Sequence, residues 1–597
     1  MPGAEVMIHP HTGEAGAIGA ALEAKRKVEK RGHSVFVGLQ SAIGLKYTTR
    51  TDEETRCTFC ANNCPRTFID TETPDGRTAR YIAGFSCEKG TVESKEAVQE
   101  LNRERKKLKE QYPNLVDYEA ELVFRHFYEP EPLPEEGTVA EHEETVHRWF
   151  GWGKARQERV VRPIRRSNAA NMEARGKIRI GLPRVLNHYV LAPFFRTYLE
   201  ALGISRRNVV FSDETSEELW AEGGKYGAID PCYPSKVAQA HLHDLILKKN
   251  KRKQIDYIWF PSITDMPSFV TNTVANATCP IVAGTPQVVH AAFIKEKDYF
   301  AEGGITFISD PVNFELPHLL RRQLYETWSR WLGITEDENE WACEQAWAAL
   351  NVCDGDLQRR GLELLTKAEQ ENDIVLLMLA RPYHNDPGMN HKIFEEFQAL
   401  GYPVISLRSI PKDPAWLERF FADDLRARLI DDVFDVRDVW PENYSVNSVQ
   451  KVWAAKFAAR HPNVGVVDLS SFKCGHDAPT YGLVDSIISA TRTPYLALHD
   501  LDANKPGGSI AIRVKTFAYA LELYKEETAE RLAKRSDLEK ALAAKRAELV
   551  EKYRVELEQN IAESGGQAAE GLAAAFEAYV NGDEAEQEES EEERNVA

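Results

Sequence analysis

Short apolar runs and helix-like stretches alternate twice along this sequence. From residue 177 the chain reads KIRIGLPRVL, then the helix-like APFFRTYLEALG, then the apolar NVVFSD. The pattern restarts near residue 373 with DIVLLMLARPYH, NHKIFEEFQALG and YPVISL. Strands that alternate with helices in this way predict parallel sheets covered by helices. We therefore expect an α/β fold with two Rossmann-like parallel-sheet units, at 176–335 and 373–522.

The other segments of the 597-residue chain differ from these units in composition. The stretch after residue 523 carries apolar residues at three- and four-residue spacing, which predicts a long helix, and it ends in an acidic run. We expect small and apolar residues at 1–50, a cysteine-rich module at 51–95, a charged helical linker at 96–175, a helical connector at 336–372, and a long helix with an acidic disordered tail at 523–597.

Charge and apolar pattern exclude some classes of function. Lysine and arginine number 74 and the acids 93, so the formal net charge is 74 − 93 = −19, which argues against general nucleic-acid binding. No run of about 20 apolar residues predicts a membrane span, and the first residues do not resemble a signal peptide. We therefore expect a cytoplasmic protein, in which nine cysteines indicate metal binding before disulfides.

Four cysteines are grouped in the cysteine-rich module. Cys57, Cys60 and Cys64 follow a C-x2-C-x3-C spacing, and 22 residues separate Cys64 from Cys87. Four thiolates suit tetrahedral zinc and also an iron–sulfur cluster. Pro65 follows Cys64 directly, as a proline follows a ligand cysteine in bacterial ferredoxins, which favours iron. We expect these four residues to bind metal, with an iron–sulfur cluster and zinc both open.

Three further cysteines stand where predicted strands end or in loops. Cys232, Cys279 and Cys474 each lie beside proline or glycine, which form the tight turns found in ligand-binding loops. Ligands of open α/β sheets gather at the carboxyl ends of the strands, so these thiols could meet. A 4Fe–4S cluster held by three thiolates would leave one iron free for a substrate. The alternative is that all three are buried core cysteines, as we expect for Cys343 and Cys353.

The loop after the apolar run at 374–380 carries two candidate catalytic residues. Arg381 and His384 lie in ARPYHNDPGMNH, where polar side chains could orient or protonate a substrate. The alternative is an ordinary turn that Asn385 and Asp386 cap.

At this point several sequence blocks resemble a known family, the acyl-CoA dehydratase activase-related proteins. This group is linked to 2-hydroxyglutaryl-CoA dehydratases, benzoyl-CoA reductases and their activators. The resemblance covers about residues 50–520 and rests on CTFCANNCPRTFID with YIAGFSCEKG, IGLPRVLNHYVLAPFFRTYLEALG, DPCYPSKVAQAHLHDLI, NATCPIVAGTPQVV, ARPYHNDPGMNHKIFEEFQALG and SSFKCGHDAP.

The resemblance implies iron–sulfur chemistry driven by an ATPase. It implies that Cys232, Cys279 and Cys474 are cluster ligands, and it leaves a double-cubane cluster open. We expect residues 1–50 to be a remnant that resembles the end of the family's actin-like ATPase domain, because residues 6–24 are similar to its last segment, but the phosphate-binding motifs are missing. We therefore expect that ATPase to act in trans, with ferredoxin or flavodoxin as a possible electron donor and a small molecule, such as a CoA ester, as substrate.

Two functions from different classes remain open at this stage. The first is an iron–sulfur oxidoreductase or dehydratase component that takes low-potential electrons from the ATPase and uses the three-cysteine cluster for reduction or radical dehydration. The second is a non-catalytic scaffold that binds zinc through the four-cysteine module and recruits the ATPase. Metal and sulfide content separates the two.

Overall fold

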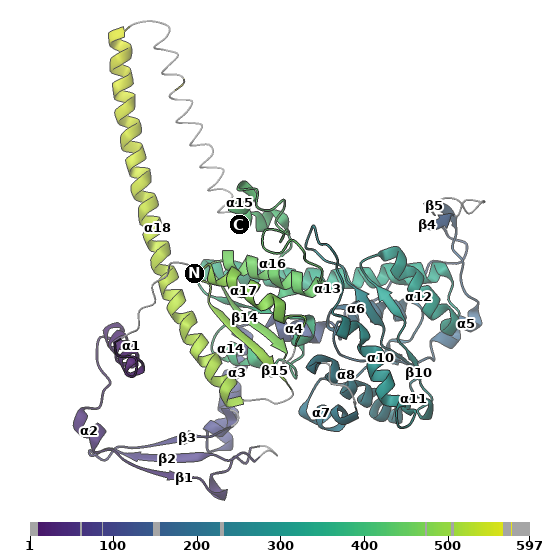
Figure 1. Ribbon diagram of the computed structural model, residues 1–597, viewed down its shortest axis with the longest axis horizontal. Helices are drawn as coiled ribbons and strands as arrows, with labels where there is room; N and C mark the ends of the chain where they lie inside the picture. Colours follow the sequence, from purple (N-terminus) through teal and green to yellow (C-terminus); the bar gives the residue numbers. More distant parts are fainter. Residues whose placement is uncertain are drawn as a thin grey trace. The chain divides into compact units, whose positions relative to one another are not determined.

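The computed structural model describes residues 10–59, 63–85, 88–146, 156–226, 232–471, 474–502, 507–564 and 575 (Figure 1). The chain divides into two compact units, Met1–Arg105 and Lys106–Ala597. Within the described residues, no helix is long and apolar enough to cross a membrane.

The first unit is built on a small antiparallel sheet. Three strands pair in the order β1-β2-β3, with Thr48 opposite Asp70 and Phe68 opposite Ile82. Its elements are α1 (Ala15–Arg31), α2 (Leu39–Ile43), β1 (Lys46–Arg50), β2 (Thr67–Glu72), β3 (Thr78–Ala83) and the start of α3 (Lys95–Gln111). The cysteine-rich loop lies between β1 and β2.

The second unit begins with elements that precede the first parallel sheet. The stretch expected to be a charged helical linker contains helices and also an antiparallel hairpin of β4 and β5, with Glu141 opposite Val161. These elements are α4 (Leu115–Leu122), β4 (Val139–Val146), β5 (Arg156–Pro163) and α5 (Ala169–Arg175).

A four-stranded parallel sheet with the order β10-β8-β6-β7 follows. The strands are short and buried, as Ile180 and Ile258 show, which is why they read as apolar runs. The elements are β6 (Ile180–Leu182), α6 (His188–Ala201), β7 (Val209–Phe211), α7 (Glu217–Gly223), α8 (Tyr233–His243), α9 (Asn250–Arg252), β8 (Tyr257–Trp259), β9 (Ser262–Asp265), α10 (Pro280–Ile294), α11 (Tyr299–Glu302), β10 (Thr306–Ile308), β11 (Pro311–Asn313) and α12 (Pro317–Leu332).

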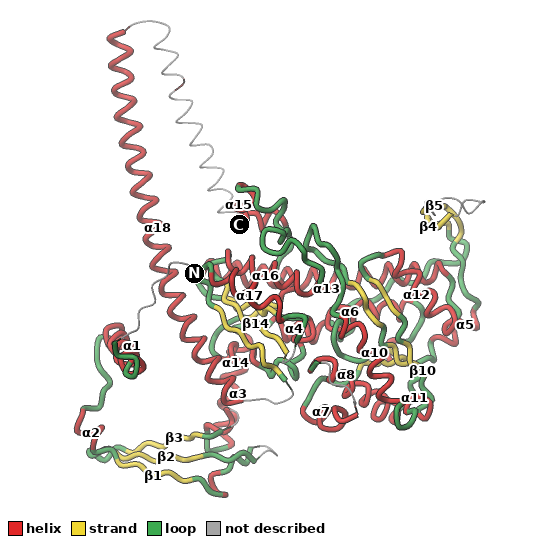
Figure 2. Tube along the Cα trace, viewed as in Figure 1, coloured by secondary structure: helices red, strands yellow, loops and turns green. Residues whose placement is uncertain are grey.

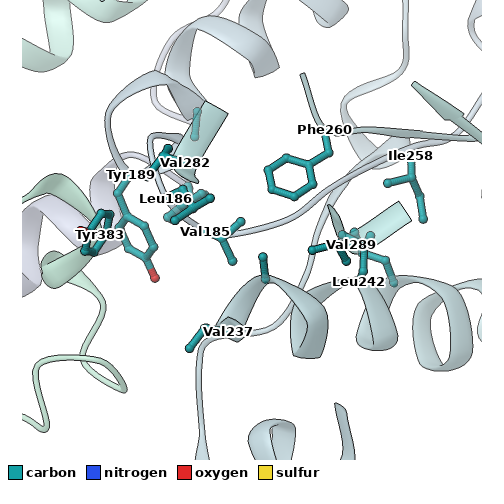
Figure 3. Close-up of a cluster of buried hydrophobic side chains, with 14 of the residues drawn as sticks. Val185, Leu186, Tyr189, Val237, Leu242, Ile258, Phe260, Val282, Val289 and Tyr383 are labelled. Carbon is teal, nitrogen blue, oxygen red and sulfur yellow. The ribbon is translucent and has the colours of Figure 1, made fainter. Parts of the chain in front are cut away.

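Helices cover both faces of this sheet (Figure 2). On one face, Ile258 packs with Val237 of α8 and Val289 of α10, and Figure 3 shows part of this cluster. On the other face, Trp259 packs with Phe195 of α6 and Trp328 of α12. The alternation of neighbouring strand residues between two cores is the expected geometry of a doubly covered sheet.

A second four-stranded parallel sheet has the order β13-β12-β14-β15. In β12, Leu377 packs toward α16 and α17, whereas Leu376 and Met378 pack toward α14 and α18. The elements are α13 (Glu336–Glu371), β12 (Val375–Leu379), α14 (Ile393–Ala399), β13 (Val404–Ser406), α15 (Pro414–Arg426), α16 (Val446–Arg460), β14 (Val464–Ser471), α17 (Ala478–Ser489), β15 (Tyr495–Leu501) and α18 (Gly507–Ser564).

The structure confirms the α/β class and its parallel sheets. When the strands of each sheet are numbered along the chain, both sheets have the order 2-1-3-4. In the first sheet β6 lies between β7 and β8, and in the second sheet β12 lies between β13 and β14. Helix α13 contributes Cys343 to the core of the first sheet and Leu365 to that of the second. The expected acidic tail, from residue 565 on, lies outside the described residues apart from residue 575.

Candidate functional site at the carboxyl ends of the strands

The strand order itself creates a binding position in each sheet. Where neighbouring parallel strands send their connections to opposite faces, the loops at their carboxyl ends diverge and leave room for a ligand. In the second sheet these strands are β12 and β14, which pair directly from Val375 with Val464 to Leu379 with Asp468. Arg381 and His384 follow β12, and Cys474 follows β14. The fold therefore places these three residues at the same end of adjacent strands.

The three scattered cysteines all stand at the start of a helix that crosses from one strand to the next. Cys232 is the N-cap of α8, and Cys279 is the N-cap of α10. The carbonyl oxygen of Cys474 accepts a hydrogen bond from the Ala478 N–H at 3.1 Å, in the first turn of α17. Helix N-termini carry partial positive charge, which favours thiolates and other anions. The position of each thiol therefore suits a negatively charged group.

The thiols of Cys279 and Cys474 both act electrostatically on the Cys232 thiol. Burial is the main cause that raises the pKa of Cys232 to about 11, and the charges of Cys279 and Cys474 contribute to the same rise. A hydrogen bond from the Ser235 backbone and the charge of Arg381 act in the opposite direction. The Cys474 thiol behaves in the same way, because burial raises its pKa while backbone N–H groups lower it. Without metal Cys232 and Cys474 therefore keep their protons at neutral pH, and a bound metal would displace those protons.

The cysteines of the described residues do not form a site for a single metal ion. Within the part of the chain that the structure describes, no three His, Cys, Asp or Glu side chains are grouped closely enough to hold one metal ion. A cubane of iron and sulfide is larger than one ion, so its thiolate ligands stand further apart. Three thiols on separate helix N-termini, with electrostatic interaction between them, are compatible with that larger group.

A buried ion pair lies beside Cys474. The Nε of Arg381 donates to Oδ1 of Asp477 at 2.9 Å, and its second terminal nitrogen donates to Ser448 Oγ at 2.8 Å. Burial alone would raise the pKa of Asp477, but the charges of Arg381 and Lys451 outweigh it and hold that pKa below the usual range. The two charges of the pair act on the pKa of Cys474 in opposite directions, because Asp477 raises it and Arg381 lowers it.

His384 is neutral in this environment. Burial lowers its pKa to about 3, its Nε2 lies 3.0 Å from Ser471 Oγ, and its Nδ1 has no hydrogen-bond partner among the described residues. A neutral imidazole can accept or donate a hydrogen bond, but it cannot deliver a proton as imidazolium at neutral pH. Next to it, Tyr383 packs against Tyr189 (Figure 3). Burial raises the pKa of Tyr383, and the charges of Cys474 and Cys232 act in the same direction.

Sequence reasoning missed a buried charged pair between Lys451 of α16 and Asp468 in the middle of β14. Lys451 Nζ lies 2.5 Å from Asp468 Oδ1, and both side chains are almost fully buried. His499 and Tyr495 also contact Asp468, each at 3.0 Å. An aspartate inside the apolar run VGVVDLSS is the signal that could have indicated this pair, because a buried carboxylate needs a partner.

Only part of the four-cysteine module can be described. The Cys57 N–H donates to the Cys64 carbonyl at 2.9 Å, so these two residues close one loop. Cys57 is buried and Cys64 half-buried, and both are free thiols. Cys60 and Cys87 lie outside the described residues.

Arg66, which the sequence did not single out, organises this loop. Its guanidinium is buried and donates to the carbonyl oxygens of Thr55 at 2.8 Å and Val92 at 2.7 Å. It also donates to the Gly90 carbonyl at 3.2 Å. The arginine therefore joins the Cys57–Cys64 loop to the segment that follows Cys87.

The remaining cysteines serve the core. Cys343 and Cys353 lie within hydrophobic clusters on α13, and burial raises the pKa of Cys353 to about 12.

Comparison with protein-family models gives a match to part of the chain. A family model described as "CoA enzyme activase uncharacterised domain" matches residues 179–410. This segment contains Cys232, Cys279, Arg381 and His384, whereas Cys474 follows it. A search of curated proteins found no match. The chain therefore contains a CoA enzyme activase-related domain.

Proposed function

We propose that this chain is an iron–sulfur protein that works with an ATPase partner in a low-potential redox reaction. In this proposal Cys232, Cys279 and Cys474 hold a 4Fe–4S cluster. The observation that supports it is that Cys232 and Cys279 cap helices and that Cys279 and Cys474 both act electrostatically on Cys232.

When bound, such a cluster supplies one-electron chemistry and one iron without a protein ligand. The residues of this chain have separate tasks around it. The three cysteines bind as thiolates, which the helix N-termini and backbone N–H groups of α8 and α17 favour. The Arg381–Asp477 pair fixes a cation beside Cys474, and neutral His384 offers a hydrogen bond to a substrate near the strand ends.

The family match and the resemblance support our proposals for the partner and the substrate class. The matched domain is named after an activator of CoA enzymes, which supports an actin-like ATPase in trans as the source of energised electrons. Ferredoxin or flavodoxin would reduce that ATPase. We propose a CoA ester as substrate, reduced directly or dehydrated through a radical that one electron starts.

The four-cysteine module is a second metal-binding part of the proposal. Cys57, Cys60, Cys64 and Cys87 would bind a second iron–sulfur cluster that relays electrons, or a structural zinc. Two contacts support this part of the proposal. A backbone hydrogen bond joins Cys57 to Cys64, and the Arg66 guanidinium donates to the Thr55 carbonyl beside that loop.

Reduction under anaerobic conditions tests this function. Protein purified without oxygen should be brown and should lose visible absorbance when dithionite or a reduced ATPase partner is added. Cys474→Ala should lose about half or more of that change, because one of three ligands is gone. Cys353→Ala, which changes a core thiol, should keep it. Colourless protein that contains zinc would reject the redox function and favour the zinc-binding scaffold.

A further inference from the structure

A pocket with both polar and apolar lining residues lies beside the second sheet. Its volume is about 330 Å³, within the range of about 300–1,000 Å³ that is typical of small-molecule sites. Its wall includes Arg381 and Asn385 after β12, and Arg408 and Lys412 after β13. No cysteine is among the described residues that line it. The pocket is therefore separate from the thiols, although Arg381 borders both.

Three buried polar atoms of this wall, on Arg381, Asn385 and Glu119, have no hydrogen-bond partner among the described residues. Arg381 and Asn385 are 1% and 2% exposed, yet one terminal nitrogen of Arg381 and Oδ1 of Asn385 have no hydrogen-bond partner among the described residues. A buried donor or acceptor without a partner costs about 1–3 kcal/mol. A ligand hydroxyl could satisfy both, because it accepts from the guanidinium and donates to the amide oxygen.

Lys412 provides a cation at another part of the wall. Its Nζ donates to the Ile410 carbonyl at 2.7 Å and lies 4.5 Å from the ring centre of Phe269. Within the described part of the chain, no carboxylate lies at ion-pair distance from it. The neighbouring carboxylates of Asp354 and Glu119 pair with Arg408 instead, at 2.6 and 3.0 Å. The pocket therefore has one cation for which the structure shows no counter-ion.

The rest of the wall is mostly apolar. Its apolar side chains include Leu191, Trp347, Leu350 and Met378. An apolar wall between two polar anchors suits a carbon chain with a polar group at each end.

We propose that this pocket binds a small organic carboxylate with a second, hydroxyl-bearing end: Lys412 binds the carboxylate, Arg381 and Asn385 bind the hydroxyl, and the carbon chain lies along the apolar wall. The proposal does not depend on a metal cluster, because the pocket lining contains none of the proposed ligands.

Proton uptake is a specific consequence of this arrangement. Burial lowers the pKa of Lys412 to about 7, and Asp354 opposes this only in part. The charged groups that face Lys412 are Asp354, Arg408 and, through Arg408, Glu119, whose own pKa burial raises. A bound carboxylate would raise the pKa of Lys412, so binding above about pH 7 takes up a proton and weakens as pH rises.

Isothermal titration calorimetry of the full chain with ω-hydroxyhexanoate tests the proposal. We expect binding that Lys412→Met weakens by about tenfold to a hundredfold, the effect of one charge-assisted contact. Lys367→Met, at an exposed lysine, should bind as the wild type does. Hexanediol, which lacks the carboxylate, should bind much more weakly. Titrations at about pH 8 in two buffers of different ionisation enthalpy should show proton uptake in the wild type and none in Lys412→Met.

Three results would overturn the proposal. They are no binding of ω-hydroxyhexanoate to folded wild-type protein, equal affinity in Lys412→Met, and equal affinity for hexanediol. Cys474→Ala separates this site from the cluster, since it should lose about half or more of the redox signal and leave carboxylate binding unchanged.

Discussion

The substitution Asp477→Asn should lower the free energy of unfolding of the metal-free protein by about 3–5 kcal/mol, because it leaves a buried arginine without its counter-ion. Arg381 and Asp477 are 1% and 0% exposed, and their closest contact is 2.8 Å. Asparagine has nearly the same shape as aspartate, so the substitution leaves no cavity. The decrease in the free energy of unfolding therefore comes from the missing charge. Chemical denaturation followed by circular dichroism, on protein stripped of metal, measures it.

The pH dependence of this loss has a definite sign. The pKa of Asp477 is lower in the folded protein than in the unfolded chain, so its stabilisation is present above about pH 4 and is lost as pH falls. The difference between wild type and Asp477→Asn should therefore be full at about pH 7 and shrink in acid.

A matched control is Asp500→Asn. Asp500 pairs with Arg513 at 3.3 Å but is 62% exposed, and such surface pairs contribute about 0–1 kcal/mol. Equal effects at the two positions would contradict the assignment of a buried pair beside Cys474.

Two glycines in helix α13 should respond to alanine in opposite directions. A Cβ at Gly361 would lie 1.7 Å from the backbone oxygen of Ser409, a clash that no side-chain rotation relieves. We expect Gly361→Ala to lower the free energy of unfolding by about 1–3 kcal/mol, even though alanine favours helices. A Cβ at Gly355 would meet nothing within 4 Å, so Gly355→Ala should raise it by about 0.5–1 kcal/mol.

This pair of variants tests the contact between α13 and the segment after β13. Both changes add one methyl group to the same helix, so helix propensity contributes equally to each. Thermal unfolding of the two variants beside the wild type measures the difference. Stabilisation by both would show that Gly361 does not approach Ser409.

The sheets could be predicted because burial on both faces leaves a mark in the sequence. Strand β12 has all five residues buried, and β14 has all eight, so each appears as an apolar run. The hairpin of β4 and β5 left no such mark, because its strands mix charged residues with valine. Local composition predicts a strand only where all residues of that strand share one environment, as in a strand that is buried on both faces.

The site could be predicted only in part. Cys232 and Cys279 were indicated by the prolines that begin their helices, and Arg381 by its place after an apolar run. Arg66 and Lys412 were not, since their roles arise from carbonyl groups and aromatic rings that the fold brings together. A charged residue has the same appearance in a sequence whether it is solvated or buried, and only tertiary structure separates the two cases.

Iron and acid-labile sulfide per chain, measured on protein purified without oxygen, test the cluster most directly. We expect Cys232→Ala, Cys279→Ala and Cys474→Ala each to lose about four iron and four sulfide relative to the wild type. Cys343→Ala, at a buried core thiol, should keep the wild-type content. Unchanged iron and sulfide in all three ligand variants would contradict the account.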